Sequence, residues 1–167
     1  MSVLSRIAAI ASFRAGPQDL PASLRLLMIV VIADILVSLA SLTRVLSGGQ
    51  AFLVVVFSIG LGMLFAYLVL YLRGVSARFR QTAIALFGTD VIISLVALPL
   101  SLALSRHIGP DGGANEVPAA LAFGLMAVVI WNISVVTRIF REALDQTLLG
   151  GFLIALAYVF LTTGTAF

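Results

Sequence analysis

The chain has 167 residues, of which 62% are hydrophobic and 10% are charged. Soluble domains average about 45–50% apolar and about 25% charged residues, so this composition excludes a water-soluble fold and indicates an integral membrane protein. The net charge of +3 is too small for the dense basic patch of a nucleic-acid-binding protein. The absence of cysteine excludes disulfides, thiolate metal sites and cysteine nucleophiles.

Residues 1–23 are predicted to form an interfacial amphipathic helix and a proline-rich connector. In residues 2–14 the apolar side chains recur with helical spacing on one side, which is typical of a helix that lies in the membrane interface. A signal-peptide hydrophobic segment is the alternative, but Arg6 interrupts it. Residues 15–22 contain two prolines and a glycine and should form an extended connector.

Residues 24–167 form the predicted membrane domain, an all-α polytopic bundle with five transmembrane helices. The spans are expected at about residues 24–46, 51–72, 81–104, 119–139 and 147–167, each long enough to cross a hydrocarbon core of about 30 Å. Residues 47–50 should make a tight turn into the second span. Gly62 and Ala66 have a spacing that lets two helix backbones approach, and Pro99 should kink the third span near its outer end.

The distribution of arginine predicts the orientation. With a cytoplasmic N-terminus, eight of the ten arginines lie in cytoplasmic segments, including Arg73, Arg78 and Arg80 of a short basic loop, and only Arg44 and Arg106 lie outside. Because positively charged loops stay in the cytoplasm, we expect the N-terminus inside and the C-terminus outside. All basic residues are arginine and Ala and Gly are abundant, which favours a GC-rich bacterial genome and hence a bacterial inner membrane.

Three polar residues, Asp34, Asp90 and Asn132, lie inside the predicted spans at about 10–15 Å from their cytoplasmic ends. This similar depth predicts one intramembrane polar cluster, with Ser38 and Ser94 as further hydrogen-bond partners. An aspartate near the centre of a span costs about 2.5–3.5 kcal/mol to insert, so each should face protein, water or a partner. The cluster is either a proton or ion relay or a set of interhelical hydrogen bonds that fix packing. The sequence favours the packing role. Its five spans have short loops and no internal repeat, and transporters are typically built from such repeats.

The polar stretch 106–118 contains three residues of types that can bind a metal ion, namely His107, Asp111 and Glu116. A single histidine with two carboxylates on a glycine-rich loop is more typical of a solvated loop, so no metal or cofactor is expected. Asp34 and Asp90 nominally offer the two aspartates of an intramembrane protease, but neither has the sequence context of those enzymes. The chain also lacks a nucleophile elbow and a phosphate-binding glycine loop, so we expect no enzymatic activity.

The order of these parts resembles the Yip family, five-span membrane proteins named for their interaction with Ypt/Rab GTPases. The resemblance covers most of the chain from Leu24. It rests on the arginine-rich loop with the span RQTAIALFGTDVIISLVALP, on Trp131 and Val135, on the turn REALDQT and on Gly150-Gly151. It implies a non-enzymatic membrane organiser or trafficking-type factor. The long polar N-terminal region and the aspartate-leucine-tyrosine-glycine-proline type of motif found in eukaryotic members are missing here, so GTPase binding is not part of this expectation.

The sequence therefore predicts a non-enzymatic integral membrane protein that acts as an organiser or assembly factor. Its expected partners are the lipid bilayer and another membrane protein or a second copy of the chain, with no nucleic acid. The alternative is a small transporter or channel component with a proton- or ion-linked site at Asp34 and Asp90.

Overall fold

The computed structural model describes residues 2–44, 46–107 and 117–164, and the secondary structure of these residues is entirely helical. The prediction of an all-α bundle is therefore confirmed. The elements in chain order are α1 (Val3–Ala11), the 3-10 turn η1 (Pro17–Asp19), α2 (Leu24–Leu42), α3 (Gly48–Leu72), the 3-10 turn η2 (Ser76–Arg78), α4 (Phe79–Ser105), α5 (Ala119–Ala143) and α6 (Leu148–Thr163).

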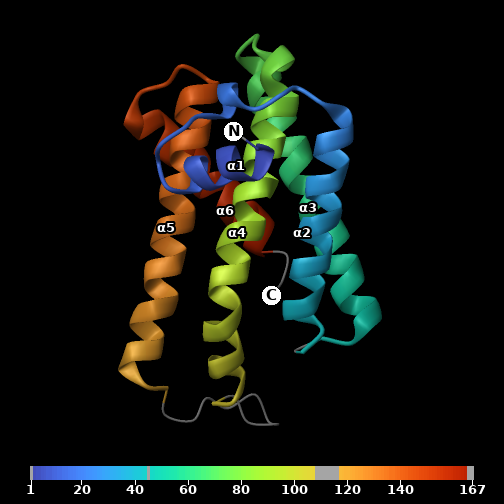
Figure 1. Cartoon of the computed structure of the whole chain (residues 1–167), viewed down its shortest axis with the longest axis vertical. Helices are drawn as coiled ribbons and strands as arrows, with labels where there is room; N and C mark the ends of the chain where they lie inside the picture. The colour runs from blue at the N-terminus through green and yellow to red at the C-terminus, as the bar shows by residue number, and fades with distance from the viewer. Residues whose placement is uncertain (1, 45, 108–116, 165–167) are drawn as a thin grey trace.

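Helices α2 to α5 run side by side along the long axis of the molecule, and α6 packs against α5 and α3 (Figure 1). Helices α2, α4 and α6 begin, and α3 and α5 end, at the same end of the bundle. We call it the arginine-rich end, because it carries Arg25, Arg73, Arg78, Arg80 and Arg141. Helix α1 lies across α4 and α5 near this end instead of running along them (Figure 1).

Hydroxyl side chains begin several of the helices. Ser23 Oγ accepts a hydrogen bond from the amide of Leu26 at 3.3 Å, and Thr147 caps α6 in the same way. The predicted tight turn over residues 47–50 is wrong, because α3 already begins at Gly48. Ser47 Oγ donates to Gln50 Oε1 at 2.9 Å, so these residues form a helix-starting capping box instead of a turn.

Within the described residues, four helices are long and apolar enough to cross a membrane, namely α2, α3, α4 with the preceding 3-10 turn, and α5. Helix α6 is equally apolar but has 16 residues, a length of about 24 Å against a hydrocarbon core of about 30 Å. The predicted count of five spans is thus not confirmed, and residues 165–167 of the fifth predicted span lie outside the described residues.

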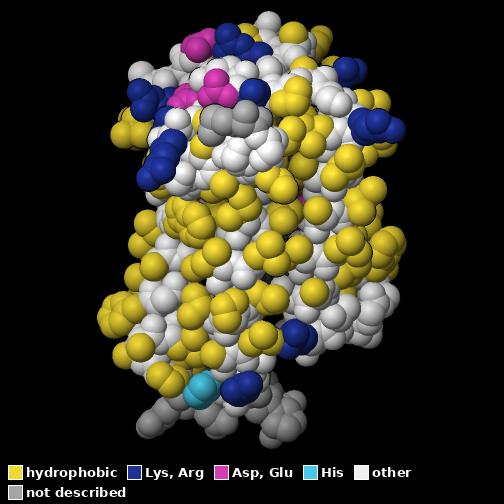
Figure 2. All heavy atoms as spheres, in the orientation of Figure 1, with side chains coloured by type: hydrophobic (Ala, Val, Ile, Leu, Met, Phe, Trp, Pro, Cys, Tyr) yellow, Lys and Arg dark blue, Asp and Glu magenta, His cyan; other side chains and the backbone are white. Residues whose placement is uncertain are grey.

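The outer surface of the bundle is apolar, as expected for helices that cross a membrane. Figure 2 shows hydrophobic side chains covering the middle of the face in view, with charged side chains gathered at the arginine-rich end and further basic side chains near the opposite end. Large apolar side chains such as Ile32, Leu53 and Phe123 are 57–69% exposed along α2, α3 and α5. A surface of this kind needs an apolar solvent, so the protein is an integral membrane protein.

Helix α4 is the centre of the core. Eight consecutive residues, 82–89, are buried on every side, because α1, α2, α5 and η1 surround this part of the helix. At Gly88 an added Cβ would lie 3.0 Å from Ile7 Cδ1, so the glycine lets α1 approach closely. The predicted amphipathic helix is therefore present, but Ile7 and Ile10 pack on α4 with only 4% and 1% exposure instead of facing lipid.

Small residues set the spacing of α6. Gly62 and Ala66 are buried on α3, and a Cβ on Gly62 would lie 3.1 Å from Tyr158 Oη. A Cβ on Gly151 would lie 2.8 Å from the backbone oxygen of Thr137, so the backbones of α5 and α6 are almost in contact there. Pro99 is exposed inside α4, which continues past it to Ser105.

Candidate functional site

Four helices each carry one polar residue at the same depth from the arginine-rich end of the bundle. Asp34 lies ten residues after Leu24, Asp90 eleven after Phe79, Asn132 eleven before Ala143 and Tyr158 ten after Leu148. At 1.5 Å per residue, each is about 15–17 Å from the arginine-rich end of its helix. Because the helices are packed side by side, equal depth brings these side chains together in the interior.

Asp90 is the residue that connects this group. Asn132 Nδ2 donates a hydrogen bond to Asp90 Oδ1 at 3.2 Å, and Asp34 and Asp90 line the same cavity, close enough to interact electrostatically. A carboxylate can only accept hydrogen bonds, so two neighbouring carboxyl groups could bond to each other only if one of them carried a proton. The structure thus places the three residues of the predicted polar cluster in contact across α2, α4 and α5.

The side chain of Asp34 is the least satisfied member. It is 3% exposed, and its Oδ1 has no hydrogen-bond partner among the described residues. Leaving a buried polar atom unpaired costs about 1–3 kcal/mol, more for a charged group. The free oxygen is therefore a position that a proton, a cation or a donor group would occupy favourably.

A cavity of about 440 Å³ adjoins the acid pair. It extends from Asp34, Asp90 and Tyr158 toward the opposite end of the bundle, where Leu42 and Ala97 line it. Its wall holds the hydroxyl groups of Ser38, Ser58, Ser94, Thr89, Thr162 and Thr163, and no basic residue of the described chain lines it. The cavity is thus lined by interspersed hydroxyl and apolar side chains, with its two acidic residues at the inner end.

The short last helix shapes this cavity. Helix α6 contributes Tyr158, Val159, Thr162 and Thr163 near its C-terminal end, and Ser58 of α3 donates to the backbone oxygen of Thr162 at 2.6 Å. Figure 1 shows α6 ending about halfway along the bundle. The outer half of the cavity wall is therefore built from α2, α3, α4 and α5.

Sequence reasoning missed Tyr158 and Ser58. Tyr158 lies close enough to both aspartates to interact with them electrostatically. The depth rule that related Asp34, Asp90 and Asn132 would also have selected Tyr158, the only tyrosine in the predicted fifth span. Ser58 carried no comparable signal, because serine is common in apolar helices and often bonds only to its own backbone.

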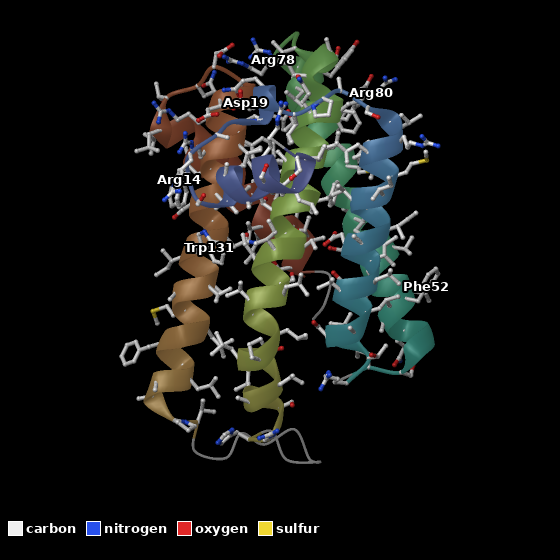
Figure 3. All side chains as sticks on the ribbon, viewed as in Figure 1. Arg14, Asp19, Phe52, Arg78, Arg80 and Trp131 are labelled. Atoms are coloured by element: carbon white, nitrogen blue, oxygen red, sulfur yellow. The ribbon has the colours of Figure 1, made fainter. Side chains whose placement is uncertain are left out.

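The basic loop is organised by the turn between α5 and α6. Arg78 Nη1 donates to Asp145 Oδ2 at 2.8 Å and to the backbone oxygen of Ala143 at 3.1 Å. Arg73 lies against the side-chain amide of Gln146. Arg80 belongs to α4 and not to a loop, and it lies on the α2 side of the arginine-rich end (Figure 3). These arginines are about 15 Å from the acid pair and do not belong to the same site.

The polar stretch near His107 adds no second site within the described residues. His107 Nδ1 lies 2.9 Å from the backbone oxygen of Ala103, at the end of its own helix. Asp111 and Glu116, the other two residues that could be drawn as metal ligands, lie outside the described residues.

Comparison of the chain with protein-family models, with curated proteins and with solved structures finds no match. The resemblance to the Yip family therefore stays a prediction from the sequence, and function has to be inferred from the site itself.

Proposed function

We propose that the protein is a small transporter or channel component whose Asp34–Asp90 pair binds a proton or a small cation. The observation that carries this proposal is the contact of two carboxyl groups at the inner end of a cavity inside an apolar bundle. Ionisable residues at such depth are expensive and are retained where they pair or handle charge.

The acid pair needs a positive charge. Two neighbouring carboxylates repel each other in a site of low dielectric constant, and no described basic side chain lines the cavity to compensate them. A shared proton or a bound cation removes this repulsion. Asn132, Tyr158 and the cavity hydroxyls supply the neutral groups that would hold either one in place.

The cavity supplies access to the pair. The lining of the cavity runs from the acid pair to Leu42, the last residue of α2, so the cavity is directed toward the end of the bundle opposite the arginines. On the other side, residues 82–89 and the layer formed by α1 close the interior. A proton or ion would enter from the end opposite the arginines and would need a rearrangement of α4 or α6 to leave at the arginine-rich end.

The test is flux through the purified protein in lipid vesicles that contain a pH-sensitive or a cation-sensitive dye. We expect an imposed gradient to drive uptake, and the double change Asp34→Asn and Asp90→Asn to abolish it while thermal unfolding stays cooperative. Asp145→Asn, the same chemical change at the exposed arginine-rich end, is the matched control and should keep the flux. Equal flux in the wild type and the double variant, or none above empty vesicles for protons, sodium and potassium, overturns the proposal.

A second candidate function is that of a membrane organiser that works through intramembrane partners or as a homo-oligomer. It is favoured by the hydrogen bonds that connect α2, α4 and α5 through Asp90, because such bonds alone can fix how helices pack. The Yip-like order of parts points the same way. Native mass spectrometry of protein extracted with its own lipids would support this role by a stoichiometric protein partner or an oligomer that the double asparagine variant loses.

We further infer that the arginine-rich end faces the cytoplasm of a bacterial inner membrane, because eight of the ten arginines favour that side. The chain has no cysteine, so single cysteines can report the orientation cleanly. Ser76→Cys should be shielded from an impermeant thiol reagent added to intact cells, and Ser105→Cys should react. The reverse pattern would overturn the orientation.

A further inference from the structure

A second pocket, of about 500 Å³, lies on the outside of the bundle between α5 and α6. We call it the arginine pocket. Arg138, Arg141 and Thr137 of α5 line one side of it, Leu149 and Phe152 of α6 the other, and Phe13 covers one edge. The acid pair does not reach this pocket, because Asn132 and Val136 face the inner cavity from the opposite face of α5.

The lining of the arginine pocket changes from charged to apolar residues along α5, starting from the arginine-rich end. Counted from Ala143 at the arginine-rich end, Arg141 lies about 3 Å, Arg138 about 8 Å and Ile133 about 15 Å along the helix. The pocket is thus positively charged next to the polar end of the bundle and becomes apolar with depth. A phospholipid has the same order of groups, with the phosphate outermost and the acyl chains innermost.

The two arginines are held differently. Arg138 Nε donates to Glu142 Oε1 at 2.7 Å, and Arg138 also donates to the backbone oxygen of Phe13, which connects α5 to the end of α1. Arg141 is exposed and makes no hydrogen bond or ion pair within the described residues. Its guanidinium is therefore available to an anionic oxygen, and a planar guanidinium suits a phosphate group well.

Thr137 gives a second and independent indication of a ligand. Its side chain is 5% exposed, lines the arginine pocket, and its Oγ1 has no partner among the residues that the structure describes. A threonine hydroxyl inside a helix usually donates to the backbone oxygen four residues earlier, as Thr89 does to Ala85. Along α5, Thr137 lies between Arg141 and Ile133, at the level where a phospholipid carries its ester oxygens.

We propose that the arginine pocket binds one anionic phospholipid, with its phosphate on Arg141 and Arg138, an ester oxygen near Thr137 and an acyl chain along Ile133, Leu149 and Phe152. Charge complementarity and the order of groups along α5 select this occupant. A second protein helix would cover the apolar wall but would leave Arg141 without an anion.

The test uses native mass spectrometry of the full chain in detergent, with equal amounts of phosphatidylglycerol and phosphatidylcholine added. We expect selective retention of one phosphatidylglycerol. Arg141→Gln should lower this retention about tenfold, because a charge-assisted hydrogen bond is lost. Ser134→Trp, which fills the pocket from an exposed position and leaves both arginines in place, should abolish it.

Arg80→Gln is the matched control, since it removes the same charge at the same end but on the α2 side of the bundle, whereas Arg14 and the pocket lie on the α5 side (Figure 3). It should leave retention unchanged, and all variants should keep the wild-type unfolding temperature. Equal retention of both lipids, equal losses in the Arg141 and Arg80 variants, or displacement of the lipid by inorganic phosphate would each overturn the proposal.

Discussion

The inner cavity and the arginine pocket lie on opposite faces of the same helix and have opposite charge. Asn132 and Val136 of α5 face the inner cavity beside the acid pair, while Thr137 and Arg141 face the arginine pocket. The 3.6-residue period of the helix separates the two sets. Both pockets are also lined by α6, which contributes its C-terminal half to the first and its N-terminal end to the second.

The difference shows how charge is placed in an apolar bundle. The arginines lie near the polar end, where their long side chains can reach the lipid headgroups. The free-energy cost of their charge is therefore small. The aspartates lie about one and a half to two and a half helical turns deeper, where a charge or an unpaired oxygen is costly unless it has a partner. Depth therefore makes the arginine pocket a candidate for binding an anion from the membrane, and the inner cavity a candidate for a proton or cation.

The largest expected effect comes from separating the helices that line both pockets. Gly151→Ala adds a Cβ that would lie 2.8 Å from the backbone oxygen of Thr137 and 2.9 Å from Arg141 Cβ, so α5 and α6 must move apart. We expect a loss of about 1–3 kcal/mol in the free energy of unfolding, measured by denaturation in detergent. Gly60→Ala is the matched control, because a Cβ there meets nothing within 4 Å and should be neutral or stabilising.

Removing one hydrogen bond on the inner side of α5 should distinguish the two faces. Asn132→Ala takes the donor away from Asp90 Oδ1 and should cost about 1–2 kcal/mol, because the carboxyl group stays buried in the bundle. Ser134→Ala on the outer face removes a hydroxyl that only bonds to its own helix, at Ile130, and should change stability by less than about 0.5 kcal/mol. Equal losses of unfolding free energy in both variants would mean that removing a hydrogen bond costs no more on the inner face of α5 than on the outer face.

The layer that α1 forms over the bundle depends on one side-chain hydrogen bond that can be removed cleanly. Trp131 Nε1 donates to the backbone oxygen of Ala11 at 2.9 Å, and Trp131→Phe keeps most of the ring while deleting the donor. We expect a loss of about 1 kcal/mol and faster amide hydrogen exchange in α1, with exchange in α4 unchanged. Phe123→Leu, an aromatic change at an exposed position of α5, serves as the control. Unchanged exchange in α1 would show that its apolar contact with Gly88 and the bond from Arg138 to Phe13 hold it without the Trp131 bond.

The smallest expected effect is at the surface of the arginine-rich end. Arg78 and Asp145 form an ion pair at 2.8 Å, but their side chains are 44% and 74% exposed. Exposed pairs contribute about 0–1 kcal/mol and are screened by salt. Arg78→Gln should therefore lower the unfolding free energy by less than about 1 kcal/mol, with the difference shrinking in high salt. A larger and salt-independent loss would indicate that its bond to the backbone oxygen of Ala143 is the important one.

Much of this structure follows from local sequence. Composition and length predict the helices, since about 20 apolar residues in a row have few other solutions in a membrane. Helix starts at Leu24, Ala119 and Leu148 lie within one residue of the expected span starts. The depth of Asp34, Asp90 and Asn132 could also be read from the sequence, because rise per residue is the same in every helix.

Only the tertiary structure decided how these helices face one another. Rotation about each helix axis depends on packing against neighbours, and apolar side chains that meet lipid and those that meet protein are chemically alike. For this reason the depth of Tyr158 could be read from the sequence, but the sequence could not show that its side chain turns toward the acid pair, that α1 packs on Gly88, or that Thr137 and Arg141 share a pocket with α6. The helical start at Gly48 was missed because Ser47-Gly48-Gly49 was interpreted as a turn, although Ser47 and Gln50 have the spacing of a capping box.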